Sequence, residues 1–192
     1  YRAREPGIIH RLDTRTSGLV VAARSAPAFE ALRAALSSHR LDKRYLAIVE
    51  GARLPDATRI ELPLAPDPSG SGRVLVAPPD AGRPPSVSVV RTLERRGRFA
   101  LVEVEASRAY RHQVRVHLAA RGWPIAGDLD YGGAARDALA GRHALHASHV
   151  AWAGDERVPA FTVDSPLPDD LRSFFVSASV ASGGDSSTSH SS

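Results

Sequence analysis

Apolar and polar side chains alternate along much of this chain, with the two-residue period typical of strands that bury one face. The alternation is clearest over residues 99–105, and a turn at Arg96-Gly97-Arg98 joins this segment to a similar one at residues 87–93. We therefore expect a hairpin there. Shorter apolar runs predict further strands at residues 19–23, 45–50, 60–64, 74–77, 145–152 and 158–163, the last two as a closing hairpin.

Three segments have helical character instead. Ser25 as a cap, Pro27 in the first turn and an Ala/Leu-rich run to residue 36 predict a first helix. A second is expected over residues 112–121, where Gly122 ends it, and a third over residues 169–176. Strands in hairpins with helices between them predict an α+β fold, built on a mixed, largely antiparallel sheet with a few flanking helices.

Composition narrows the class of protein. The 192 residues, 43% of them hydrophobic, suit one globular domain, which we place at residues 1–176, ahead of a disordered Ser/Gly-rich tail at 177–192. No run of about eighteen apolar residues is present, so we expect no membrane partner. The absence of cysteine excludes disulfides and cysteine-ligated metal sites, and it favours a cytoplasmic location.

The basic residues suggest a nucleic-acid partner. The net charge is +4, and every basic residue except Lys43 is an arginine, whose planar fork suits phosphate. Residues 91–121 hold eight arginines against three acids, a basic stripe of the kind that binds nucleic acid. The alternative is a solvated strand face.

The segment His10-Arg11-Leu12-Asp13-Thr14-Arg15-Thr16-Ser17-Gly18 sets one carboxylate among arginines and hydroxyls. Asp13 stands on the loop that enters the strand expected at residues 19–23, a usual place for a catalytic side chain. Alternatively, Asp13 only bonds backbone amides in a turn. This segment alone does not favour one interpretation over the other.

A second polar segment, Ser107-Arg108-Ala109-Tyr110-Arg111-His112-Gln113-Val114-Arg115, opens the second predicted helix. Because Arg111 and Arg115 are one helical turn apart, we expect them to share a face that holds a carboxylate or a phosphate.

Four motifs, in this order and spacing, resemble those of the RluA-like family of pseudouridine synthases: His-Arg-Leu-Asp at residues 10–13, Thr-Ser-Gly-Leu at 16–19, Lys43-Arg44-Tyr45-Leu46-Ala47 and His112-Gln113-Val114-Arg115. Further matches at residues 124–132, 145–147 and 166–171 extend the resemblance over residues 7–176. The resemblance implies an isomerase that converts uridine to pseudouridine in structured ribosomal or transfer RNA, without metal or organic cofactor. We expect a monomer that binds RNA and no DNA.

The resemblance also implies roles for single residues. Asp13 would be the catalytic carboxylate at the ribose, and whether it adds to the sugar or abstracts a proton to give a glycal stays open. Arg115 matches the arginine that pairs with this carboxylate. Tyr45 matches the tyrosine that lies against the target base and is a candidate for the late proton removal, with simple packing as the alternative. The expected RNA contacts are Arg11, Arg108, Arg111, His112 and Gln113.

The chain departs from the family pattern in two places. Family members usually carry Gly-Arg where Ala109 and Tyr110 stand here, so Arg108 or Arg111 would have to replace that arginine. Family members also have strands and an Asn-Lys-Pro-type motif ahead of His-Arg-Leu-Asp, whereas nine residues precede His10 here. We therefore expect a fragment that lacks the first strands of its domain. An RNA-binding fragment without catalysis is the alternative function.

A metal hydrolase is the other rival. His143, His146 and His149 recur at every third residue, and Asp128 and Asp130 are near in sequence. In a strand, His146 would face away from the other two histidines, which disfavours a three-ligand cluster. We expect no metal site.

Overall fold

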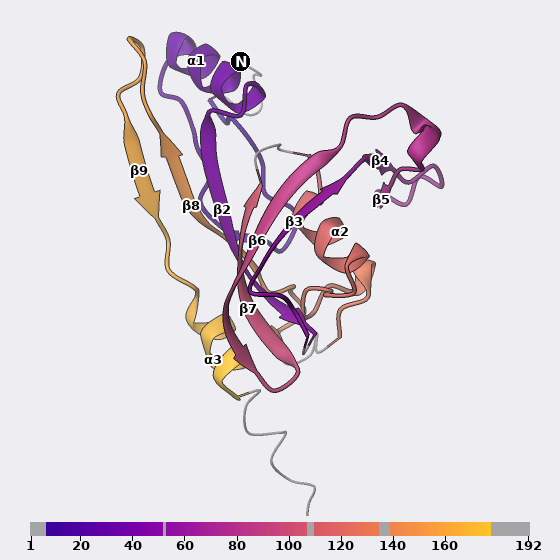
Figure 1. Cartoon of the computed structure of the whole chain (residues 1–192). Coiled ribbons are helices and arrows are strands. Elements are labelled where there is room, and N and C mark those ends of the chain that lie inside the picture. The colour runs from indigo at the N-terminus through magenta and orange to yellow at the C-terminus, as the bar shows by residue number, and fades with distance from the viewer. Residues whose placement is uncertain (1–6, 52, 107–109, 135–138, 178–192) are drawn as a thin grey trace, which may run out of the picture.

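The computed structural model describes residues 7–51, 53–106, 110–134 and 139–177, so the tail expected at 177–192 lies outside this part of the chain except for its first residue. Seven strands form the main sheet in the order β1-β8-β2-β7-β6-β3, with β9 also paired to β8 (Figure 1). The strands are β1 (Ser17–Gly18), β2 (Leu41–Glu50), β3 (Ala57–Leu62), β6 (Ser86–Arg96), β7 (Phe99–Ala106), β8 (Leu145–Trp152) and β9 (Phe161–Asp164).

The remaining elements flank this sheet. β4 (Leu64–Pro66) and β5 (Val74–Val76) form a separate two-stranded sheet. The helices are α1 (Ala26–Ser37), α2 (Gln113–Ala120) and α3 (Asp169–Ser177), and two short 3-10 turns are η1 (Pro79–Ala81) and η2 (Leu129–Tyr131). Pairing in the main sheet is antiparallel except between β1 and β8, which confirms the predicted α+β class with a mixed, largely antiparallel sheet.

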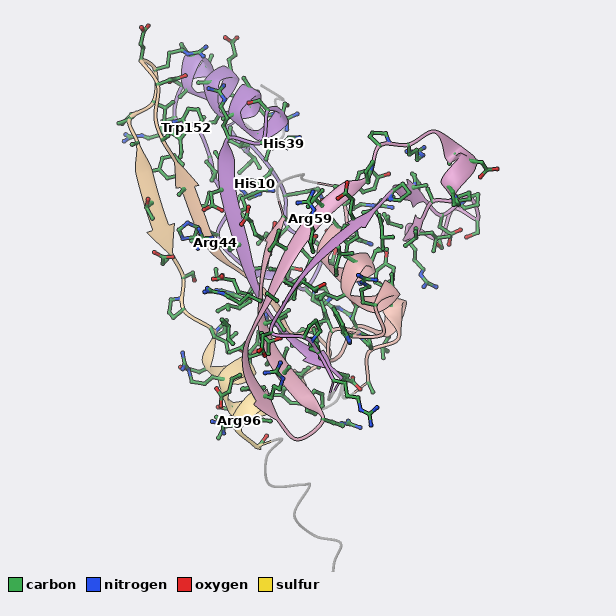
Figure 2. The ribbon with its side chains drawn as sticks, in the orientation of Figure 1. His10, His39, Arg44, Arg59, Arg96 and Trp152 are labelled. Atoms are coloured by element: carbon green, nitrogen blue, oxygen red, sulfur yellow. The ribbon has the colours of Figure 1, made fainter. Side chains whose placement is uncertain are left out.

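The core is divided between the two ends of the long strands. The larger part joins β2, β6, β7 and β8 to α2 and α3, and it includes the fully buried Leu118 and Leu171. The smaller part lies under α1, where Leu32 and Leu36 pack with Trp152, and Figure 2 shows Trp152 beside this helix. Burial of each such large side chain stabilises the fold by about 1.5–3 kcal/mol. Of the helices that the structure describes, none is long and apolar enough to cross a membrane.

The first helix forms as predicted because its cap is local. Ser25 is extended and its Oγ accepts a hydrogen bond from the Ala28 N–H at 3.3 Å, with proline in the first turn. The predicted hairpin also forms, and its arms β6 and β7 are longer than expected. β8 covers the residues that the alternation indicated.

The strand expected at residues 19–23 is wrong. The strand that forms in this region is β1, which begins two residues earlier and pairs with β8. Its Gly18 lies so close to the backbone of Ala147 in β8 that a Cβ atom at this position would overlap it. Beyond Gly18 the chain pairs irregularly with residues 7–9, through hydrogen bonds such as Ile9 N to Val21 O at 3.0 Å. Leu19 and Val21 pack against the smaller core, which combines residues of α1, β2 and β8, so the apolar run reflects burial in this core and not membership of a strand.

Two other strand boundaries differ from the prediction. The strand expected at residues 60–64 is divided at Pro63, which lacks the N–H that a continuous ladder needs, so β3 and β4 belong to different sheets. The strand expected at 158–163 begins only at Phe161, because Asp155 holds the preceding loop. Its Oδ1 accepts hydrogen bonds from the N–H groups of Arg157 and Val158, each at 2.9 Å.

Candidate active site

Asp13 lies in a tight turn that the backbone itself closes. The Thr16 N–H donates to the Asp13 carbonyl oxygen at 2.9 Å, and Arg15 within the turn has a left-handed φ of 76°. A turn therefore exists, as the alternative interpretation of Asp13 proposed. The ion-pair contacts of its carboxylate, however, are with side chains of another segment, Arg115 and His112.

Two histidines near the start of β8 hold this turn in place. Thr16 Oγ1 is 2.7 Å from His143 Nε2, and Ser17 Oγ is 2.8 Å from His146 Nδ1. Both histidines are buried. Their spacing suggested metal ligands, but their partners here are the hydroxyls of residues 16 and 17. The position of Asp13 thus depends on a strand far along the chain.

Arg115 faces Asp13 from the first turn of α2. Its Nη1 is 3.8 Å from Asp13 Oδ2, at ion-pair distance, and the side chain is only 5% exposed. Its Nε and Nη2 each donate to one oxygen of Asp128 at 2.7 Å, a two-point grip on one edge of the guanidinium. Asp130 accepts a further bond from Nη2 at 2.8 Å. Asp128 therefore orients Arg115 so that Nη1 is left for Asp13.

The electrostatics of Arg115 follow from these contacts. Burial alone would lower the pKa of Arg115, but the hydrogen bonds to Asp128 and the charge of that carboxylate outweigh burial, and the net pKa is raised. The ring of Tyr131 also lies 4.8 Å from the guanidinium. The role of Asp128 in orienting Arg115 was not predicted from the sequence, where Asp128 was considered only as a possible metal ligand and within the family match at residues 124–132.

His112 lies beside Asp13. Its Nε2 is 3.9 Å from Asp13 Oδ1, and its Nδ1 is 2.8 Å from the Tyr131 hydroxyl. Its φ of 57° is left-handed, which costs a non-glycine residue about 1–2 kcal/mol. Burial lowers the pKa of His112 and outweighs the opposing effect of Asp13, so the imidazole is neutral near pH 7. Among the described residues, Arg115 is then the permanent cation within ion-pair distance of Asp13.

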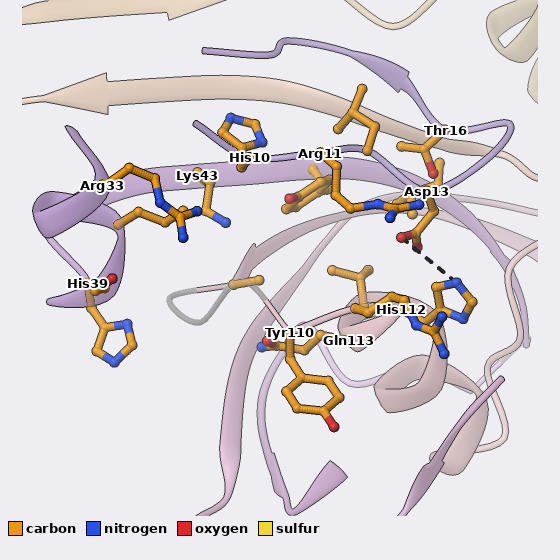
Figure 3. Close-up of a pocket in the computed structure, with 18 residues that line it drawn as sticks. His10, Arg11, Asp13, Thr16, Arg33, His39, Lys43, Tyr110, His112 and Gln113 are labelled. Atoms are coloured by element: carbon orange, nitrogen blue, oxygen red, sulfur yellow. Dashed lines mark ion pairs between the residues drawn. The ribbon is translucent and has the colours of Figure 1, made fainter. Parts of the chain in front are cut away.

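A cavity of about 590 Å³ opens over Asp13. Tyr45 of β2 lines it, and burial, with a smaller contribution from Asp13, raises the pKa of Tyr45 to about 12. A phenol that stays protonated at neutral pH suits a surface for a base better than a proton acceptor. Figure 3 shows Arg11 close to Asp13 on one side of the cavity and Tyr110 with Gln113 on another.

The prediction that Arg111 and Arg115 share one face of the second helix is wrong. The left-handed His112 precedes the first residue of α2, so Arg111 lies outside the helix. Arg111 is exposed at the edge of the cavity and donates from Nη2 to the Arg73 carbonyl oxygen at 3.2 Å. Arg108, the alternative to Arg111, lies outside the described residues.

Gln113, expected to contact RNA, lines the cavity and uses its amide nitrogen within the protein, whereas its Oε1 has no hydrogen-bond partner among the described residues. The side chain is buried, and its Nε2 donates to the Val87 carbonyl oxygen at 2.8 Å and to Ser88 Oγ at 3.2 Å. This side chain therefore ties the start of α2 to β6.

The three histidines of the metal hypothesis have separate partners. His143 and His146 bind the hydroxyls that anchor the Asp13 turn, and His149 Nδ1 is 2.6 Å from Asp164 Oδ1. The two aspartates of that hypothesis bind Arg115. In the part of the chain that the structure describes, no three such side chains are grouped to hold a metal ion.

The basic stripe of residues 91–121 does not form one RNA-facing surface. Arg91 pairs with Glu103 and Arg95 with Asp56, each at 2.7 Å. Arg96 lies beside α3, at the end of the sheet remote from His10, as Figure 2 shows. The cations that line the cavity come from scattered positions: Arg11, Arg33 and Lys43 lie outside the stripe and Arg111 lies within it.

Comparison with known proteins identifies relatives of this chain. Residues 2–120 match the family described as RNA pseudouridylate synthase. An uncharacterized RNA pseudouridine synthase of Chloroflexus aurantiacus is 38% identical over 87% of this chain and 52% of its own length. Ribosomal large subunit pseudouridine synthase D of Neisseria meningitidis serogroup A is 32% identical over 96% of this chain and 51% of its own length. The chain thus spans about half the length of these relatives.

Solved structures show the same fold. The human RNA pseudouridylate synthase domain containing 1 superimposes with a TM-score of 0.72 at 24% identity, over 91% of this chain and 75% of that one. The human RNA pseudouridylate synthase domain containing 4 gives the same TM-score at 20% identity.

Proposed function

The chain belongs to the RNA pseudouridylate synthase family, and we propose that it isomerises uridine to pseudouridine in structured RNA. The observation that carries the proposal is the geometry around Asp13. This carboxylate faces a cavity, and a buried arginine oriented by a second carboxylate stands 3.8 Å away. We further propose residues 1–176 as the catalytic domain.

The reaction needs a carboxylate at the sugar and no external reagent. The bond from the ribose anomeric carbon to N1 of uracil breaks, the base turns, and a bond from the same carbon to C5 forms. The proton on C5 is lost and N1 gains one, so atoms and charge balance. A carboxylate beside the anomeric carbon acts as nucleophile or stabilises oxocarbenium-like charge, as in glycosidases. Asp13 has this role in the proposal.

The neighbours of Asp13 support it in distinct ways. Arg115 places a permanent positive charge 3.8 Å from the Asp13 carboxylate, which attracts the carboxylate and holds it at the cavity. Tyr45 lies against the base, and at the late step it would accept the C5 proton only if bound RNA lowered its raised pKa. Arg11, next to Asp13 in Figure 3, contacts the RNA strand beside the nucleotide that leaves its stack.

We propose ribosomal or transfer RNA as the substrate and a monomer as the active form. The relatives named as ribosomal large subunit synthases support a ribosomal substrate, which also favours a cytoplasmic location. The alternative function is RNA binding without catalysis, and the substitution of Ala109 and Tyr110 for the family Gly-Arg motivates it.

Substitution of Asp13 tests the proposal. Asp13→Asn keeps the shape of the side chain but removes its charge, so tritium release from RNA labelled at C5 of uridine should fall by at least about a thousandfold. RNA affinity should stay within a few-fold. The control is Asp80→Asn, an exposed aspartate of η1, which should leave turnover unchanged. Substantial turnover by Asp13→Asn would refute the assignment, and RNA binding by the unsubstituted chain with no tritium release would favour the alternative.

A further inference from the structure

The end of the cavity away from Asp13 holds two cations, and neither forms an ion pair with an acidic residue in the part of the chain that the structure describes. Lys43 of β2 is 5% exposed, and Arg33 of α1 lines the same end of the cavity. Figure 3 shows both side chains at the end of the cavity away from Asp13. Arg33 Nη1 donates to the Ile9 carbonyl oxygen at 2.9 Å. Of the described residues that line the cavity, Asp13 is the acidic one.

The charge of Lys43 is costly where it lies. Burial lowers the pKa of Lys43 to about 8, so the fold penalises its ammonium form. Burial, and then the charge of Lys43, also lower the pKa of His10. The Nε2 of His10 accepts a hydrogen bond from the Val21 N–H at 3.3 Å, as a neutral imidazole does. An anion in the cavity would offset the cost of the buried ammonium.

The position of Lys43 relates this end of the cavity to the reacting end. Lys43 and Tyr45 are two residues apart on β2, so they share a face and lie roughly 6.6 Å apart along the strand. Asp42 and Arg44 point to the opposite face and pair with each other at 2.8 Å. An anion held by Lys43 would therefore lie next to a base held by Tyr45.

We propose that Lys43 and Arg33 form a subsite for a backbone phosphate of RNA, that of a nucleotide adjacent to the target uridine. The inference rests on the proposed function. It also accounts for the one lysine in a chain whose other basic residues are all arginine, because a compact ammonium presents one strong charge at the end of a narrow space. RNA then binds the cavity at two points, the sugar at Asp13 and a neighbouring phosphate at Lys43.

The test measures how binding of a fluorescein-labelled twelve-nucleotide oligouridine depends on salt. Each phosphate neutralised on a single strand contributes about 0.7 to the slope of log Kd against log salt concentration. Lys43→Met should weaken binding about tenfold at low salt and reduce this slope by about 0.7. Lys43→Gln, a polar replacement, should change the affinity and the salt slope in the same way as Lys43→Met. The thermal midpoint of either variant should be no lower than that of the unsubstituted chain, because a buried charge is removed.

Two controls separate a phosphate contact from other effects. Arg44→Met changes the same strand on the opposite face and should leave the slope unchanged. On an oligouridine with a neutral methylphosphonate backbone, the unsubstituted chain and Lys43→Met should bind equally. If Lys43→Met still binds the neutral strand more weakly than the unsubstituted chain does, the subsite is refuted and the proposed function is not. The same holds if the salt slope of Lys43→Met is unchanged. If the unsubstituted chain binds no RNA even at 50 mM salt, the subsite and the proposed function are both refuted.

Discussion

Arg115 divides its guanidinium among three carboxylates, and this division positions the candidate catalytic group. One edge is fixed on the buried Asp128, and Nη1 remains for Asp13. Asp130 also binds Nη2, but its side chain is 57% exposed, so water screens this pair. The two aspartates contact one arginine at similar distances but differ in burial and in the number of bonds, two for Asp128 and one for Asp130, so mutation of each compares a buried two-point contact with an exposed single one.

Asp128→Asn should lower the free energy of unfolding by about 3 kcal/mol, because it leaves the buried Arg115 without its main countercharge. Turnover should fall by about a hundredfold as Arg115 shifts relative to Asp13. Asp130→Asn should cost under about 1 kcal/mol and little activity. Urea unfolding at pH 7 and tritium release measure the two effects. Equal losses in both variants would show that Asp128 has no special role in orienting Arg115.

At the scale of elements, α2 owes its stability to tertiary contacts. It has eight residues, begins without a side-chain cap, and buries six consecutive residues, 113–118. Polar groups on its buried side meet one residue of β6: His117 Nδ1 is 2.9 Å from Ser88 Oγ, and Gln113 donates to the same hydroxyl. The helix that carries Arg115 is therefore aligned by buried polar contacts, and protonation of His117 should disturb them.

Stability should consequently fall on acidification between about pH 6.5 and pH 4. Burial lowers the pKa of His117 to about 4, so in this window the unfolded chain binds a proton that the folded chain does not. The stability contribution of neutral His117 is present above pH 6.5 and is lost as pH falls, up to about 3 kcal/mol. His117→Gln should remove this part of the pH dependence in urea unfolding between pH 7 and pH 4. If the free energy of unfolding depended on pH in the same way for the unsubstituted chain and for His117→Gln, the prediction would be contradicted.

At the scale of the whole molecule, β2 is the central strand on which the cavity is built. β7 and β8 pair with its two edges along most of its length, and it carries both Tyr45 and Lys43. β3 and β9 lie at the two sides of the sheet, each paired on one edge only. The cavity residues Tyr45 and Lys43 are thus carried by a strand that is paired on both edges.

Hydrogen exchange should report this arrangement. Amides of Ile48 and Val49 in β2 should exchange on the order of a hundredfold or more slowly than those of Arg59 in β3 or Thr162 in β9, because central strands open only with larger unfolding events. Deuterium uptake at neutral pH, resolved to single strands, measures the difference. Equal protection of β2 and β3 would contradict the prediction.

The sequence by itself determined features that depend on near neighbours. The Ser25 cap predicted α1, the alternation over residues 99–105 predicted β7, and the motif around Asp13 indicated the candidate catalytic carboxylate. The predictions of α1 and β7 are confirmed because capping and strand periodicity involve residues close together in the chain. The same logic misplaced the strand at 19–23, since an apolar run does not say whether it meets a sheet or a helix.

Only the tertiary structure decided how distant side chains meet. It shows that Asp128 orients Arg115, that the left-handed His112 leaves Arg111 outside α2, and that Lys43 faces the cavity without a carboxylate partner among the described residues. None of these follows from spacing. Each depends on which charges and hydroxyls the packing of separate segments brings within a few ångströms, and the free energy of a buried charge is set by those neighbours.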